Sequence, residues 1–232
     1  MVGNIFFNLF IMPLELLFEI VFSIFYRLFS NPGISILALS LVMNFLVLPL
    51  YRRADAIQEE EKDKAISMSR WTDHIKKTFS GDERYMILNT YYRQQNYKPI
   101  SSLRSTFSLV LQLPFFIAAY HYLSNLSILK GMKFLIFNDL GAPDGLIAIG
   151  SLHVNVMPVL MTAINVLSAY VYLRGFPLKN KIQTYAIAAV FLVLLYDSPS
   201  GLVFYWTLNQ IFSLCKNLIM KEIGRASCRE RV

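Results

Sequence analysis

The sequence predicts an all-α, polytopic membrane protein with five transmembrane helices, and three observations lead to this fold class. Of the 232 residues, 55% are hydrophobic and 16% are charged, and the mean hydropathy is positive. Several apolar stretches are long enough to cross roughly 30 Å of hydrocarbon as helices. Basic residues gather in alternate connections between these stretches. The chain therefore carries more apolar surface than one soluble core of this length needs.

The transmembrane helices are predicted at four long apolar stretches and one shorter stretch. The long stretches are 33–50, 106–123, 155–173 and 200–219. Each holds about 18 to 20 residues, which is the length that an α-helix needs to cross the hydrocarbon layer. The shorter stretch, 182–196, completes the five if its polar start lies at the interface.

The distribution of basic residues predicts the orientation of these helices. The connection 51–104 carries eleven Lys or Arg. The connection 124–153 carries only Lys130 and Lys133. Because cytoplasmic loops of membrane proteins hold the excess of Lys and Arg, we expect the N-terminus outside and the C-terminus inside. This rule also accounts for the formal charge of +7, and the eight carboxylates in 51–104 disfavour nucleic-acid recognition.

Residues 1–32 predict an amphipathic helix that lies on the outer interface. Pro13 suits the first turn of a helix that runs to about Phe29, and turn residues follow at 30–33. The polar residues of this helix fall near one stripe: Asn8, Glu15, Glu19, Ser23 and Tyr26. Two acidic side chains in that stripe disfavour deep insertion. The alternative is a sixth transmembrane helix whose acidic side chains face other helices.

The basic connection 51–104 predicts a cytoplasmic hairpin of two helices. Apolar residues recur at helical spacing in two sets, Met68, Trp71, Ile75 and Phe79, and then Tyr85, Leu88 and Tyr92. Ser80-Gly81-Asp82 forms a turn between them, so the helices are expected to be antiparallel, and Pro99 ends the second. Glu60 and Lys64, four residues apart, form an ordinary surface pair.

Turn and capping residues organise the second half of the chain. Residues 138–141 and 143–145 predict turns in the outer connection 124–153. Ser198 as a cap and Pro199 as the first residue predict the start of the fifth transmembrane helix. His121 and His153 have no second ligand at metal-binding spacing, and neither cysteine belongs to a metal or disulfide pattern, so we expect no metal and no cofactor.

The last eleven residues, 222–232, break abruptly into a short basic tract. We interpret this tract as the in-frame translation of a DNA-sequencing adapter, and we leave it out of the fold. On this interpretation the natural chain is cut just after the fifth transmembrane helix. The alternative is a genuine basic tail at the cytoplasmic end of that helix.

Five sequence blocks appear in a characteristic order along the chain. They are Pro13-Leu14, Val47-Leu48-Pro49-Leu50, Gln112-Leu113-Pro114-Phe115-Phe116, Phe137-Asn138-Asp139-Leu140 with Asp144, and Pro199-Ser200-Gly201-Leu202-Val203-Phe204-Tyr205-Trp206. Each block alone is weak. Together, with five transmembrane helices and a charged hairpin between the first two, they resemble the YidC/Oxa1/Alb3 family of membrane protein insertases over roughly residues 7–221.

The resemblance implies an insertase core at 33–221 in the bacterial cytoplasmic membrane. Its five helices are expected to form a polar groove that is open to the cytoplasm and to lipid and closed outside. A polar part of a client protein in this groove need not meet bare hydrocarbon. The expected partners are nascent membrane-protein clients and the lipid bilayer, with the ribosome and the Sec translocase as further candidates. No bond is broken in such a reaction, so we expect no enzyme.

The resemblance also identifies the residues expected to line the groove and contact clients: Asn44, Gln112, Leu113, Phe116, Tyr205 and Trp206. Bacterial members commonly carry an Arg five residues before the Pro of the Leu-Pro-Leu block, and this chain carries Asn44 there. We therefore expect a groove that is polar but uncharged, serving clients of low acidic content or relying on a partner. For Asn44 the alternative is an amide that packs two helices together. For Tyr205 and Trp206 the alternative is an aromatic belt at the outer interface.

Two other functions remain open at this point. A transporter or channel would use the same polar residues to line a pathway through the membrane, although a small pore has no need of a long cytoplasmic hairpin. A structural or assembly subunit, with an insertase-like domain inside a larger membrane protein, is the other alternative.

Overall fold

A computed structural model describes residues 7–97, 107–149, 152–173 and 178–229 of the chain. The helices are η1 (Phe7–Ile11), α2 (Met12–Phe29), α3 (Pro32–Thr78), α4 (Gly81–Gln94), α5 (Phe107–Asn125), η3 (Ser127–Leu129), α6 (Val156–Tyr172), α7 (Leu178–Leu195) and α8 (Ser200–Arg229). The strands are β1 (Ile147–Ile149) and β2 (Leu152–Val154). The predicted helical fold class is confirmed, while the division into five transmembrane helices stays a prediction.

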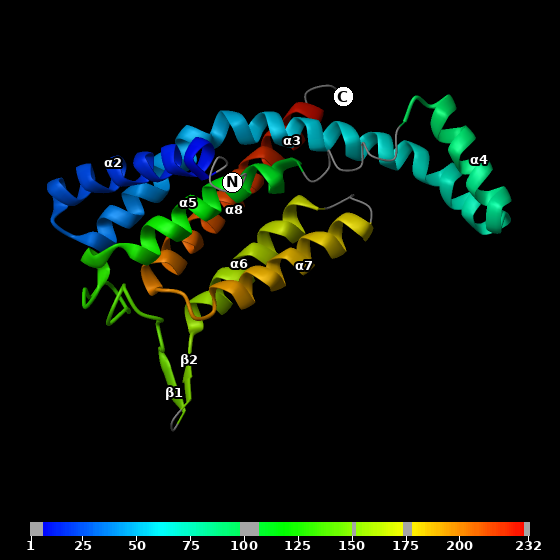
Figure 1. Cartoon of the computed structure of the whole chain (residues 1–232). Coiled ribbons are helices and arrows are strands. Elements are labelled where there is room, and N and C mark those ends of the chain that lie inside the picture. The colour runs from blue at the N-terminus through cyan, green and yellow to red at the C-terminus, as the bar shows by residue number, and fades with distance from the viewer. Residues whose placement is uncertain (1–6, 98–106, 150–151, 174–177, 230–232) are drawn as a thin grey trace.

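Helix α3 joins the first predicted transmembrane helix to the first arm of the hairpin without a break. Asn31 caps its start, because its side-chain oxygen accepts hydrogen bonds from the backbone N–H groups of Gly33 (3.0 Å) and Ile34 (3.2 Å). The helix continues through Pro49 to Thr78. Figure 1 shows it extending beyond the other helices to α4.

Two helices, the end of α3 and α4, occupy the predicted hairpin, but α4 has no buried residue and Tyr85 on its predicted inner face is 71% exposed. Met68 and Ile75, on the inner face of the first arm, are buried, although Trp71 on the same predicted face is 60% exposed. Gly81 begins α4 with a φ of 58°, a backbone conformation that glycine adopts without strain. The predicted surface pair is also present, with Lys64 Nζ 2.6 Å from Glu60 Oε1. The predicted end at Pro99 lies outside the described residues.

Helix α2 packs against α3 and α5 through one apolar face. Phe18 and Phe22 on this face are fully buried, and the Phe18 ring lies 5.7 Å from that of Tyr205 on α8. The opposite face exposes an apolar side chain every fourth residue: Met12, Leu16, Ile20, Ile24 and Leu28. Glu15 instead faces α5, where its Oε1 atom is 2.5 Å from His121 Nδ1. Whether α2 lies on the interface or spans the membrane stays a prediction.

The remaining helices form a bundle around α8, which contacts α3, α5 and α6, while α7 packs on α6. The first turns of α8 form its core, because every residue from 200 to 207 is buried. The outside of the bundle is apolar as well, with large exposed side chains on each of α3, α6, α7 and α8, including Phe45, Leu167, Val193 and Ile219. Soluble monomers rarely expose apolar surface on this scale.

The length and composition of the helices also indicate a membrane environment. In the described part of the chain, two helical segments, Phe7–Phe29 and Pro32–Thr78, are long and apolar enough to cross a membrane. The shorter helical segments Val156–Tyr172 and Lys181–Leu195 are apolar too. Lipid is therefore the natural environment of the bundle surface.

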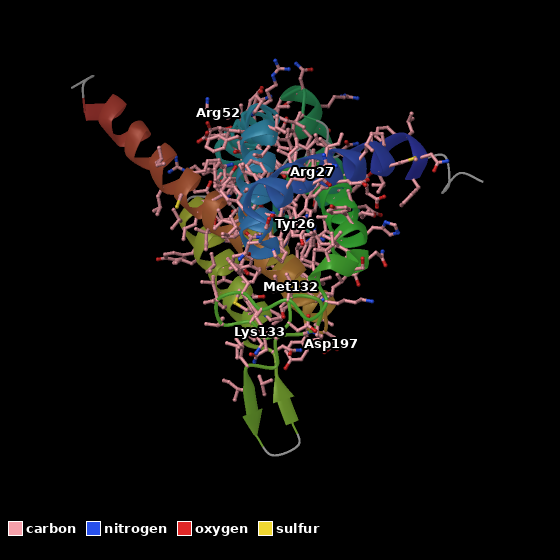
Figure 2. All side chains as sticks on the ribbon, turned by 90° about the vertical axis from the view of Figure 1, so that its left-hand side faces the viewer. Tyr26, Arg27, Arg52, Met132, Lys133 and Asp197 are labelled. Carbon is pink, nitrogen blue, oxygen red and sulfur yellow. The ribbon has the colours of Figure 1, made fainter. Side chains whose placement is uncertain are left out.

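A small β-hairpin projects from the end of the bundle opposite to α4 (Figure 1). Strands β1 and β2 pair in an antiparallel register, with Ile147 opposite Val154. The sequence predicted only turns in this connection, because the strands are just three residues each. Figure 2 shows Met132, Lys133 and Asp197 near the base of this hairpin, on the loops that close this end of the bundle.

Candidate functional site

Two adjacent hollows between the helices form a polar groove. The first, called the α3 hollow, is lined from α3, α5 and α8 by residues that include Asn44, Tyr51 and Asn209. The second, called the α7 hollow, is lined mainly from α6, α7 and α8, with Asp55 and Gln58 of α3 at its edge. Both hollows share one set of lining residues: Gln112, Trp206, Gln210, Ser213 and Lys216. The two hollows together are the polar groove.

Asn44 is half-buried and connects α3 to α8. Its side-chain amide donates hydrogen bonds to the backbone oxygen of Ser40, at 2.8 Å, and to the side-chain oxygen of Asn209. The Ser40 hydroxyl donates to the same Asn209 oxygen at 2.9 Å. Asn44 thus packs two helices together and also lines the α3 hollow. The two alternatives for this residue are compatible, and contact with clients stays a prediction.

The other predicted residues divide into two groups. Gln112 and Trp206 line both hollows, and Tyr205 lines the α3 hollow. Tyr205 and Trp206 are each only 3% exposed, so neither ring forms part of an exposed aromatic belt in the structure. The structure brings these three residues and Asn44 together in one groove.

Phe116 and Leu113 lie outside the lining of the groove. Phe116 is buried, with its ring edge-to-face against those of Phe191 (4.8 Å) and Trp206 (5.0 Å), so it supports the Trp206 ring. Leu113 is 48% exposed and lines neither hollow. The contact of these two residues with clients stays a prediction, and the structure gives Phe116 a packing role in addition.

The polar groove contains an ion pair, which corrects the expectation of an uncharged groove. Lys216 Nζ on α8 lies 2.7 Å from Asp55 Oδ2 on α3, and the two side chains are 19% and 26% exposed. The ammonium group also lies 5.8 Å from the centre of the Tyr51 ring, within the range of a cation–π contact. Lys216 falls inside the predicted span 200–219, and a lysine at such a position is itself a signal of a functional site.

Loop residues are hydrogen-bonded to the helix ends at the end of the bundle that bears the β-hairpin. Asp144 accepts hydrogen bonds from the first backbone N–H groups of α6, Val156 at 2.8 Å and Met157 at 3.0 Å. The Ser200 hydroxyl donates a hydrogen bond to the backbone oxygen of Ala142 at 2.6 Å. The backbone N–H of Gly201 donates a hydrogen bond to the backbone oxygen of Leu140 at 2.8 Å. The start of α8 is therefore fixed to the connection that precedes α6.

Two glycines allow close packing at this end of the bundle. A Cβ atom added to Gly201 would lie 3.0 Å from a methyl group of Leu129 and 3.1 Å from the backbone oxygen of Leu140. One added to Gly33 would meet the ring of Phe134. Phe134 itself contacts the ring of Phe204 on α8, with the centres 5.6 Å apart. Gly201 and Phe204 belong to the last of the blocks that carry the family resemblance, whereas Gly33 and Phe134 lie outside these blocks.

Asn155 is a further structural residue that the sequence reasoning did not identify. It is 5% exposed, and its side-chain oxygen accepts a hydrogen bond from the backbone N–H of Gly145 at 3.0 Å. Its amide nitrogen donates to the backbone oxygen of Tyr196 at 2.8 Å. The side chain thus joins the connection between α5 and α6 to the end of α7. Its only signal in the sequence is a polar residue at the start of a predicted apolar span.

The fold and the groove together define a class: a helical membrane protein whose outward side chains are apolar and whose interior holds polar hollows between the helices. The chain belongs to the 60Kd inner membrane protein family, whose model matches residues 24–227. Family membership places the chain in the bacterial inner membrane.

Several curated bacterial proteins are similar to this chain. Membrane protein insertase YidC of Treponema denticola is 25% identical over 226 residues, which cover 92% of this chain and 38% of that protein. The protein of the same name from Endomicrobium trichonymphae is 27% identical over 214 residues, covering 88% of this chain and 39% of that protein. The chain thus spans about two fifths of the length of these relatives.

A solved structure shares the fold. It is described as an active YidC insertase crystal structure with the first transmembrane domain resolved, and it matches with a TM-score of 0.54 at 21% sequence identity. The match covers 90% of this chain and 45% of the solved chain. The predicted resemblance is therefore confirmed by the family, the relatives and the fold.

Proposed function

We propose that this chain is the core of a membrane protein insertase, which guides hydrophobic segments of nascent proteins from the cytoplasm into the lipid bilayer. The observation that carries the proposal is the polar groove inside a bundle with an apolar outer surface. Amide groups of Asn44, Gln112 and Gln210 line it, so a polar stretch of a client can keep hydrogen-bond partners at membrane depth. The client's apolar part meanwhile gains contact with lipid.

The closed end supports insertion rather than passage across the membrane. The seal made by Asp144, Ser200 and the ring of Phe134 lies where a channel or transporter would need an exit. We place this end outside and the α3–α4 hairpin in the cytoplasm, because the hairpin region holds eleven Lys or Arg. On this orientation the N-terminus lies outside and the C-terminus inside. The hairpin is then available to ribosomes or to the Sec translocase.

The proposal is tested by rescue of an insertase-depleted bacterium that expresses this chain. The readout is the membrane insertion of a small client with a short outer tail, measured by protease protection. We expect the chain to restore insertion and the variant Gln112→Leu to reduce it, because that change removes an amide that lines both hollows. Ile117→Ala, on the same helix but exposed and outside the lining of the groove, is the matched control.

Two outcomes would contradict the proposal. Failure of the well-expressed chain to restore insertion would favour an assembly subunit of a larger membrane protein. Solute flux through liposomes that contain the purified chain would favour a channel or transporter, since a sealed groove conducts nothing.

A further inference from the structure

The ion pair of Lys216 and Asp55 lies in the wall of the polar groove, where helices α8 and α3 meet. Lys216 lines both hollows, and Asp55 lines the α7 hollow. We propose that Lys216 is a binding site for a carboxylate of the client's polar segment, and that Asp55 occupies this site when no client is present. This inference rests on the proposed function and adds a determinant of client choice to it.

The chemistry of the ligand follows from the contact that the structure already contains. Lys216 holds a carboxylate oxygen of Asp55 at 2.7 Å, so the site accepts that group in a suitable geometry. A lysine ammonium has three donors, and one salt bridge leaves it able to bind a second acceptor. The amide side chains of Gln112 and Gln210 line the same two hollows and can hydrogen-bond the rest of a polar segment.

The exposure of the pair makes an exchange of carboxylates feasible. With 19% and 26% of the two side chains exposed, the ion pair is reached by solvent from the groove. A partly exposed ion pair contributes little net stability, whereas a fully buried one is costly to break. When a client carboxylate displaces Asp55 from Lys216, the released Asp55 carboxylate remains partly exposed to solvent, which limits the cost of the exchange.

The pair also makes the resting groove neutral, which bears on the range of clients. Asp55 cancels the charge of Lys216 when no acidic client is present, so neutral segments meet no uncompensated cation. Asn44, in the α3 hollow, adds hydrogen bonds but no charge. The preference for acidic clients should accordingly be modest in the wild-type chain and should rise when Asp55 loses its charge.

The test uses the full chain in proteoliposomes and two clients that differ only by Asp or Asn in the polar segment. The readout is the ratio of acidic to neutral client inserted. Asp55→Asn should raise this ratio about threefold or more, the scale of a partly screened ion pair. Lys216→Gln should bring the ratio below one, because Asp55 is then an unpaired anion in the lining of the groove. Lys216→Arg should preserve the wild-type ratio. The double variant, Asp55→Asn with Lys216→Gln, should bring the ratio to one, because neither charge of the pair remains.

The outcomes separate the two proposals. If wild-type chain inserts neither client, the proposed function fails. If the ratio of acidic to neutral client inserted is the same in wild type, in Asp55→Asn and in Lys216→Gln, only the carboxylate site is overturned. A double variant that keeps the preference of Asp55→Asn also overturns it. The charge-reversed pair, Asp55→Lys with Lys216→Asp, serves as the folding control, because it retains an ion pair between the two helices.

Discussion

The substitution Asn155→Leu tests how the end of the bundle that bears the β-hairpin is held together. Asn155 is 5% exposed and connects the backbone N–H of Gly145, at 3.0 Å, to the backbone oxygen of Tyr196, at 2.8 Å. Leucine has nearly the same shape but can make neither hydrogen bond. A buried backbone group that loses its partner costs about 1–3 kcal/mol. Because Gly145 and Tyr196 are only half-buried, we expect the two losses together to lower the free energy of unfolding by about 2–4 kcal/mol.

Equilibrium unfolding in mixed micelles, with SDS as the denaturant, measures this change. Asn138→Leu is the matched control, because Asn138 is an exposed asparagine of the connection between α5 and α6, and we expect it to change stability by less than about 0.5 kcal/mol. Hydrogen exchange at the amide of Gly145 should become faster in Asn155→Leu. A loss below about 1 kcal/mol, or unchanged exchange at Gly145, would refute the assigned role of the two hydrogen bonds.

Three further predictions concern the seal, the groove and the hairpin. Gly33→Ala places a methyl group against the ring of Phe134 and should lower the free energy of unfolding by about 1–3 kcal/mol. Adding Phe134→Ala to this variant should restore part of the lost stability. Equal stability of Gly33→Ala and wild type would contradict this packing. Asn44→Arg adds an unpaired cation to the groove, so insertion of an acidic client should increase relative to a neutral one, and equal efficiencies would exclude a role for charge there. Burial raises the pKa of Tyr92 and of Tyr97 in the hairpin above 10.0, so the stability that they contribute is full below that pH and is lost as the pH rises through the folded values. In phenolate absorbance, each of the variants Tyr92→Phe and Tyr97→Phe should lose one late-titrating group relative to wild type, and an unchanged titration curve would contradict the prediction.

The sequence predicted most helices because hydrophobic periodicity and turn residues are local signals. The predicted span 155–173 corresponds closely to α6, and the start predicted from Ser198 and Pro199 is close to that of α8 at Ser200. The predicted end of the first transmembrane helix at residue 50 is not the end of a helix in the structure, because α3 continues through Pro49 into the hairpin. A composition change from apolar to charged marks the edge of the membrane, and the helix itself need not end there.

The candidate site was predicted in part, because the sequence of a helix shows which of its residues are polar but not which residues of other helices they contact. Asn44, Gln112, Tyr205 and Trp206 come together in the groove as their sequence blocks suggested. The partner of Lys216 lies 161 residues earlier in the chain, and Asn155 bonds residues 10 and 41 positions away. Pairings at these separations depend on how the helices pack, and no single-chain periodicity encodes them. The stretch 200–219 is apolar on average, so the sequence prediction treated it as a transmembrane helix and did not single out Lys216, its one charged residue.

The spacing of polar groups along α8 indicates how the groove is organised by depth. Asn209, which bonds Asn44, precedes Lys216 by two helical turns, or about 10 Å at the usual rise of an α-helix. The sealed end lies at Ser200 and Gly201, so the neutral amide cluster is nearer the seal and the ion pair is nearer the hairpin. A charge is less costly near the interface than at membrane depth, whereas amides can serve farther in. In the proposed orientation, a client would meet the charged site first and the neutral amides second, so selection by charge would precede insertion.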